Sequence, residues 1–154
     1  MAEKHVFGPV VVRLEAGVSR ADLEFYGVDH FCPSYVAQIF FDDPDVDGDT
    51  ASEDRASYAG RFAVFGHQRC VGDEGHCETH AHLRRFDDRP SHPLTRAFKR
   101  VVVTEALRRH GAGDLTITVV VTSDPAELED RTKPLLRFQG MQLTTFGAPA
   151  LVNR

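Results

Sequence analysis

The sequence predicts an all-β protein, an antiparallel β-sandwich of about seven strands with one short helix and a long Cys/His-rich loop. Three observations support this prediction. Short runs of β-branched and aromatic residues recur along the chain, segments rich in Gly, Pro and Asp separate them, and only one segment carries helix start and stop signals. Such a set of short strands is typical of two packed sheets.

The first half of the chain holds four predicted strands. A Val-rich run comes first, and a more moderately alternating run follows it. The sequence SYVAQIFF is the strongest strand signal, and an Asp/Pro/Gly-rich loop ends it. These four strands are residues 6–14, 23–28, 34–41 and 58–65.

Alternation in the fourth strand assigns its two faces. In YAGRFAVF, Phe62 and Val64 share one face, and Ala63 and Phe65 share the other. We expect the large apolar residues of the strands to form the core. The expected core residues include Phe62, Phe65, Val119, Val121 and Leu136.

The second half begins with a loop over residues 66–97, longer than compact domains usually carry without a function. A short strand over 99–103 leads to a helix over 105–109, for which Thr104 is the expected N-cap. Strands over 115–122 and 135–146 complete the set.

Length and composition bound the function. The 154 residues are 42% hydrophobic and predict one domain, 1–154. A formal net charge of -5 argues against a nucleic-acid partner. No apolar run reaches the roughly 20 residues that span a membrane, so no membrane partner is expected. The N-terminus has no apolar signal core, which favours a cytoplasmic protein or an excised piece.

The most informative segment of the chain is the start of the long loop. Two of the three cysteines and four of the eight histidines lie there. Thiolate and imidazole together suit Cu(I), Cu(II) and Zn(II). The candidate metal ligands are His67, Cys70, His76, Cys77, His80 and His82.

The spacing of these ligands leaves two interpretations open. Six residues separate Cys70 from Cys77, unlike the Cys-x-x-Cys pairs of structural zinc sites. Cu(I) needs few ligands and is the ion that we expect for the two cysteines and one histidine. His67 is the best anchored candidate because it follows a strand directly. The alternative is a Cys70–Cys77 disulfide on a surface loop with exposed histidines.

The acidic loop after the third strand is a weak calcium candidate. Asp43, Asp45, Asp47 and Gly48 match the first half of a calcium loop, with Asp54 at its twelfth position. Against calcium stand Pro44, the short side chain at position 54 and the absence of flanking helical patterns. Calcium is therefore not the expected cofactor.

Three segments in order resemble a known family. They are PSYVAQIFFDDPDVDGDT, YAGRFAVFGHQRCVGDEGHC, and RVVVTEALRRHGAGDLTITVVV with the closing LLRFQGMQL. Their order and spacing over residues 22–146 resemble the C-terminal β-sandwich domain of tyrosinases, catechol oxidases and molluscan haemocyanins. The resemblance implies a non-catalytic domain that covers the entrance of a dicopper domain with a protruding side chain. Some relatives, and the caddie proteins of bacterial tyrosinases, are associated with copper delivery.

The chain departs from this family because no helical copper domain precedes the sandwich. It is either an excised domain or a stand-alone protein that serves a separate oxidase, and the start at Met1 favours the second. The best candidate for the entrance-blocking side chain is Phe86, an aromatic residue among charged neighbours, and Tyr58 is the second. The alternative for Phe86 is that it folds back onto the sandwich.

Three functional hypotheses follow. The first is an accessory protein that partners a tyrosinase-like oxidase, shields its entrance and delivers copper through the Cys/His loop. The second is a mononuclear copper enzyme with a phenolic or peptidyl substrate, which needs at least three convergent ligands and an open position. The third is an interaction domain with a structural Cys70–Cys77 disulfide. No Gly-x-Ser-x-Gly or phosphate-binding Gly loop points to another enzyme class, so an enzyme is the less favoured of these options.

Overall fold

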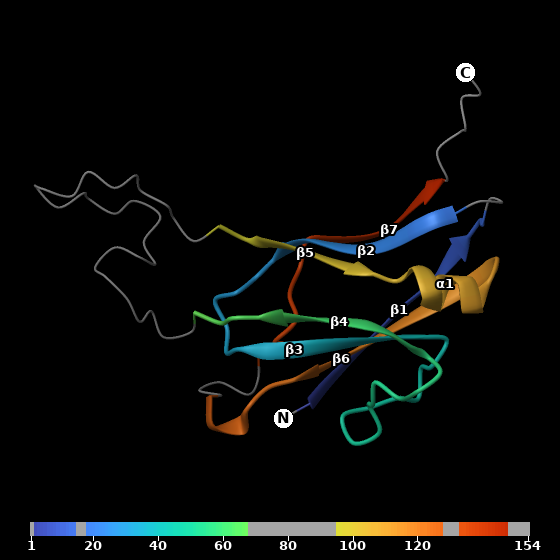
Figure 1. The fold of residues 1–154 in the computed structure, drawn as a ribbon. Helices are drawn as coiled ribbons and strands as arrows, with labels where there is room; N and C mark the ends of the chain where they lie inside the picture. The colour runs from blue at the N-terminus through green and yellow to red at the C-terminus, as the bar shows by residue number, and fades with distance from the viewer. Residues whose placement is uncertain (1, 15–17, 68–94, 128–132, 148–154) are drawn as a thin grey trace, which may run out of the picture.

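Two antiparallel β-sheets pack face to face (Figure 1). The computed structural model describes residues 2–14, 18–67, 95–127 and 133–147. One sheet has the order β1 (Ala2–Val12), β6 (Gly113–Thr122), β3 (Tyr35–Phe41) and β4 (Tyr58–Val64); the other has β5 (Ala97–Val102), β2 (Val18–Val28) and β7 (Gly140–Gly147). Helix α1 (Thr104–His110) and a 3-10 turn (Pro125–Glu127) are the helical elements of the described residues. The predicted all-β sandwich is confirmed.

The core lies between the two sheets because alternate residues of each strand point inward. In β2, Leu23 and Phe25 are fully buried. They meet residues of β3, β4 and β6, and the rings of Phe25 and Phe62 are 4.9 Å apart. The register of β3 with β6, which pairs Ile39 with Val119, brings two more buried side chains into the same cluster.

The outer face of the four-stranded sheet carries a second, smaller apolar cluster. Phe40, Val46 and Val120 are buried there, and Tyr58 packs against them. Val46 belongs to the acidic loop after β3, so this loop folds back over the sheet. Central strands that are apolar on both faces explain why the sequence reads as continuous hydrophobic runs in β3 and β6.

Several element boundaries differ from the predictions. β1 starts at Ala2 and not at residue 6, and β2 starts at Val18 and not at residue 23. The predicted strand over 135–146 starts only at Gly140, because Leu135 and Leu136 are buried in the core as part of a loop. Thr104 does not cap the helix. Its hydroxyl instead accepts a hydrogen bond from the backbone N–H of Ala21 at 2.9 Å, which ties α1 to β2, and the N-cap Val103 makes no side-chain cap.

One predicted core residue lies on the surface. Phe65 is 78% exposed, whereas Phe62 and Val64 are buried as expected. The predicted alternation of β4 is therefore confirmed, and it is this alternation that turns Phe65 outward. The prediction that Phe65 is core was wrong because none of the segments that the structure describes covers that face at the end of β4.

No helix in the described residues is long and apolar enough to cross a membrane.

Candidate functional site

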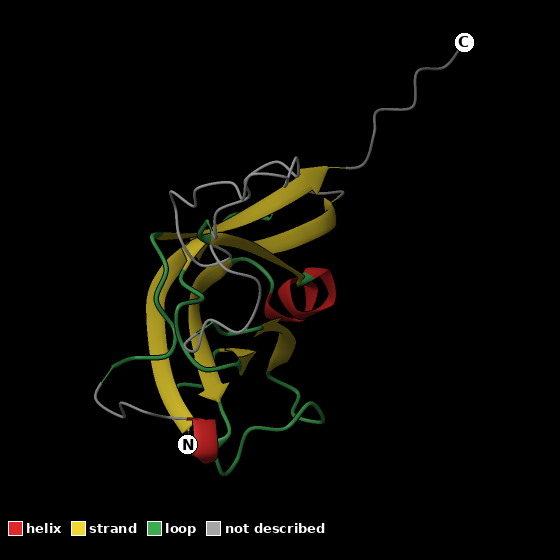
Figure 2. Cartoon of the chain, turned by 90° about the vertical axis from the view of Figure 1, so that its left-hand side faces the viewer, coloured by secondary structure: helices red, strands yellow, loops and turns green. Residues whose placement is uncertain are grey.

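His67 lies at the end of the sandwich where β4 meets the loop between β2 and β3; Figure 2 faces this end. Two hydrogen bonds join the segments. The N–H of His67 donates to the carbonyl of His30 at 2.7 Å, and the N–H of Gly66 donates to the hydroxyl of Ser34 at 3.1 Å. The sheet thus brings together two histidines that are far apart in the sequence.

Gly66 makes this approach possible. A Cβ at this position would lie 2.0 Å from the carbonyl oxygen of Cys32 and 2.4 Å from the carbonyl carbon of Pro33. Both atoms belong to the backbone, so neither can move aside cheaply. A residue without a side chain is therefore needed where β4 leaves the sheet.

The imidazoles of His30 and His67 contact each other. Their ring centroids are 5.2 Å apart with an interplanar angle of 68°. The His30 ring also hydrogen-bonds to the backbone of Thr95. Its Nε2 is buried and has no hydrogen-bond partner among the residues that the structure describes. His30 therefore has one ring nitrogen engaged and the other unengaged beside a second imidazole.

The environment keeps His30 in its neutral form. Burial lowers the pKa of His30 most, and the neighbouring His67 acts in the same direction. Asp29 and the hydrogen bond to the Thr95 backbone oppose this change but are outweighed. A neutral imidazole has a lone pair that can bind a metal ion.

An ion pair between the buried Asp29 and the partly exposed Arg137 fixes the loop that carries His30. Asp29 Oδ2 lies 2.8 Å from a guanidinium nitrogen of Arg137, and its Oδ1 accepts the N–H of Phe31 at 2.9 Å. The N–H of Asp29 also donates to the carbonyl of Arg137 at 2.8 Å. Cys32 is buried beside them, and burial raises its pKa to about 11, so it is a protonated thiol.

Most of the predicted metal ligands lie outside the described residues. They are Cys70, His76, Cys77, His80 and His82, and the first blocking candidate, Phe86, lies outside them as well. Within the described residues, no group of three or more His, Cys, Asp or Glu side chains is arranged to hold a metal ion. The copper ligand set and the alternative disulfide therefore stay predictions.

The acidic loop uses its carboxylates for its own hydrogen bonds. Asp43 Oδ2 accepts from Arg55 at 2.7 and 3.0 Å and from the hydroxyl of Ser57 at 2.6 Å. The Ser57 hydrogen bond and then Arg55 hold the pKa of Asp43 below its usual value. Asp47 Oδ1 accepts from the backbone and hydroxyl of Thr50.

The remaining carboxylates of the weak calcium set, Asp45 and Asp54, are exposed. Val46, which lies between these two residues in the sequence, packs into the smaller apolar cluster. The loop geometry thus follows from burial of Val46 and from side-chain hydrogen bonds within the loop.

Exposed aromatic side chains surround the histidine pair. The ring of Phe65 lies 5.4 Å from that of His67, and Phe31, which is 44% exposed, lies 5.4 Å from His30. Phe65 also borders a surface cavity of about 470 Å³. The cavity is lined by Ser34, Tyr35, Val36, Ala63, Val64, Phe65, Thr122, Ser123 and Asp124.

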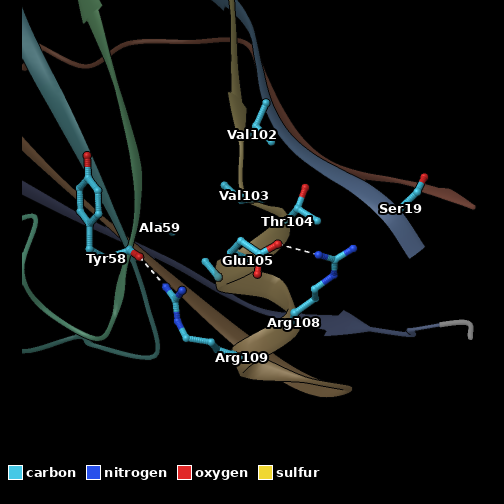
Figure 3. Close-up of a pocket in the computed structure, with 10 residues that line it drawn as sticks. Ser19, Tyr58, Ala59, Val102, Val103, Thr104, Glu105, Arg108 and Arg109 are labelled. Atoms are coloured by element: carbon cyan, nitrogen blue, oxygen red, sulfur yellow. Dashed lines mark hydrogen bonds and ion pairs between the residues drawn. The ribbon is translucent and has the colours of Figure 1, made fainter. Parts of the chain in front are cut away.

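Tyr58, the second blocking candidate, is the first residue of β4 and its ring packs against Phe40 with centroids 5.8 Å apart. Its carbonyl borders a second cavity, of about 400 Å³, beside α1 (Figure 3). Arg109 donates to this carbonyl at 2.9 Å, and Arg108 pairs with Glu105 at 2.6 Å. Both guanidinium groups in this cavity are therefore already engaged.

The sequence analysis missed His30. No metal-ligand spacing connects it to His67, and it stands in a loop between two strands. The sequence does carry an indirect signal. β3 and β4 pair in antiparallel orientation, so His67, just after β4, comes close to the residues just before β3, which include His30.

No protein-family model and no curated protein sequence matches the chain. A solved structure does: recombinantly expressed latent aurone synthase, a polyphenol oxidase, co-crystallised with hexatungstotellurate(VI). The match covers 96% of this chain and 24% of that chain, with 17% identity and a TM-score of 0.51. The chain thus spans about a quarter of the length of that polyphenol oxidase. At the level of fold, this chain corresponds to a segment of a polyphenol oxidase, as the resemblance to the tyrosinase β-sandwich domain predicts.

Proposed function

We propose that this chain is an accessory domain of a tyrosinase-like copper oxidase, which covers the oxidase entrance and supplies it with copper. The observation that carries the proposal is the fold match: nearly the whole chain corresponds to a quarter of a polyphenol oxidase. Fold by itself does not determine function, so the proposal also draws on the histidine end of the sandwich.

The covering function assigns a specific side chain. Phe65 is the most exposed large hydrophobic residue of the described chain and stands at the end of β4 beside a cavity. A second exposed aromatic residue, Phe31, contacts His30 of the same histidine pair, and exposed aromatic residues are a feature of interaction surfaces. In this proposal Phe65 contacts the rim of the oxidase entrance. Tyr58 is a weaker choice because its ring is held against Phe40.

The delivery function assigns copper as cargo. His67 joins the sandwich to the sequence that carries Cys70, His76, Cys77, His80 and His82. In a reducing cytoplasm, where we place the protein, these thiols stay reduced, and thiolates favour Cu(I). Transfer to the histidines of the oxidase then proceeds by exchange of ligands, with no change in the oxidation state of the ion.

The covering function is tested with a tyrosinase-like oxidase that lacks its own covering domain. We expect the added chain to lower the rate of diphenol oxidation, and Phe65→Ala to restore most of that rate. Phe98→Ala is the matched control, since Phe98 is also exposed, at 47%, but lies on β5 of the other sheet. Absence of inhibition by the unmodified chain, or equal relief by both variants, contradicts the covering function.

The delivery function is tested with the copper-free form of the same oxidase. We expect the Cu(I)-loaded chain to activate it in the presence of a chelator that traps free copper. The double variant Cys70→Ser/Cys77→Ser should fail to activate it while keeping the same circular dichroism spectrum. Equal activation by the double variant would exclude the cysteines from delivery.

A further inference from the structure

We propose that His30 and His67 together form a binding site for Cu(I) at the end of the sandwich. As a step in copper delivery this inference rests on the proposed function, but the binding itself is measurable on the isolated chain. The site consists only of described residues and adds His30, which belongs to no metal-ligand pattern in the sequence.

The first observation is the state of the His30 ring. Its Nε2 is buried without a hydrogen-bond partner among the described residues, and the Thr95 backbone lies beside the ring. Histidines that bind metals generally donate their other ring N–H to a backbone carbonyl or carboxylate, which fixes the tautomer and orients the ring. A buried nitrogen left without a partner is otherwise costly, and an ion would give it one.

The second observation is the spacing of the two rings. A metal at about 2.0–2.1 Å from a ring nitrogen lies about 3.2 Å from the ring centroid. Two imidazoles on one tetrahedral ion therefore have centroids about 5.2 Å apart. The centroids of His30 and His67 are 5.2 Å apart, which matches the separation that one shared ion requires.

The third observation is that the backbone on both sides is fixed. His30 follows Asp29, which is bound to Arg137. His67 follows Gly66, which packs on the backbone of Cys32 and Pro33, and its own N–H is bonded to His30. A site held by two rigid segments loses little conformational entropy when an ion binds.

The number of ligands selects the ion. Structural zinc sites have four protein ligands and catalytic zinc sites three, whereas the described residues offer two imidazoles here. Cu(I) is stable with a low coordination number and accepts imidazole. Two imidazole ligands leave coordination positions on the ion that an incoming ligand of the oxidase can occupy, which is what ligand exchange requires.

The first test uses the unmodified chain and Cu(I) alone under oxygen-free, reducing conditions. Cu(I) is diamagnetic, so the ring resonances of the histidines can be followed in ¹H–¹⁵N spectra during titration. We expect the ring nitrogens of His30 and His67 to shift together. Shifts of His76, His80 and His82 with none at His30 would overturn the inference.

The second test measures Cu(I) affinity by competition with a chromophoric chelator, in the Cys70→Ser/Cys77→Ser background so that thiolates do not mask the histidines. We expect His30→Gln and His67→Gln each to weaken binding by at least about 100-fold, the upper range for loss of even an indirect partner. His110→Gln is the control, because His110 lies on α1 and pairs with Asp42. Equal affinity in His30→Gln and the control overturns the site.

Circular dichroism and thermal unfolding of each variant separate loss of binding from loss of folding, and the first test needs no substitution. Failure of the proposed function looks different from failure of the site. In the first case the chain binds Cu(I) through His30 but does not activate a copper-free oxidase. In the second, Cu(I) binding does not depend on His30.

Discussion

The two ends of the sandwich place a histidine beside different partners. At the α1 end, Nδ1 of His110 lies 2.5 Å from a carboxylate oxygen of Asp42, whose other oxygen accepts the N–H of Thr116. At the other end, Nε2 of His30 has no hydrogen-bond partner among the described residues and faces a second imidazole and exposed aromatic rings. The same residue type therefore pairs with a carboxylate at one end and contacts a second imidazole at the other. In both His110 and His30, Nε2 is buried without a hydrogen-bond partner among the described residues.

This contrast follows from what surrounds each end. The acidic loop beside α1 supplies carboxylates that pair with Arg55 and His110. At the histidine end, the carboxylate of Asp29, the residue before His30, is already bound to Arg137. A histidine hydrogen-bonded to a carboxylate contributes to the stability of the fold, whereas two adjacent imidazoles can share one ligand.

The largest effect is expected for Gly66→Ala. The added Cβ would overlap the backbone of Cys32 and Pro33, so we expect a loss of at least about 2 kcal/mol in unfolding free energy. Gly140→Ala is the control, because a Cβ there meets nothing within 4 Å. Urea unfolding measures both. Similar values for the two variants would mean that the close approach at the histidine end does not exist.

Asp43→Ala should cause the next largest loss of stability, because it removes the hydrogen-bond acceptor for Arg55 and Ser57. Hydrogen bonds to a charged group that is only partly exposed predict a loss of about 1–2 kcal/mol. Asp45 is exposed in the same loop, so Asp45→Ala should change the unfolding free energy by no more than about 0.5 kcal/mol. If Asp45→Ala costs as much as Asp43→Ala, the paired carboxylate is not what holds this loop.

His110→Asn tests the paired histidine directly. Asp42 is 47% exposed at its side chain, so solvent screening limits the expected loss to about 0.5–1 kcal/mol at low salt. The loss should shrink when salt is added, because salt screens exposed charges. A loss that does not change with salt would assign the effect of His110 to packing instead.

The smallest expected effect is a pH dependence of the unfolding free energy that arises from His30. The folded-state pKa of His30 is lowered, so the unfolded chain binds its proton more readily. Stability should therefore be complete above the unfolded pKa of about 6.5 and should decline as pH falls below it. Urea unfolding of the metal-free chain at several pH values measures this slope, and His30→Gln should reduce it. An unchanged slope in His30→Gln would place the dependence on other groups.

The strands were predictable because their signal is local. The runs in β3, β4 and β6 match the observed strands to within a few residues, since alternation and β-branched content are properties of the segment itself. The prediction failed where a residue's role depends on the other layer. Leu135 is buried outside any strand, and Phe65 is exposed although it continues an apolar strand.

The sequence by itself determined the all-β class, the position of most strands and the location of His67 next to a strand end. Only the tertiary structure decided that His67 contacts His30 and that Gly66 lets β4 approach the backbone of Cys32 and Pro33. It also decided that Arg55 binds the carboxylate of Asp43. The physical reason is that alternation and turn chemistry act between neighbours in the chain, whereas each of these contacts joins segments that only sheet pairing and loop packing bring together.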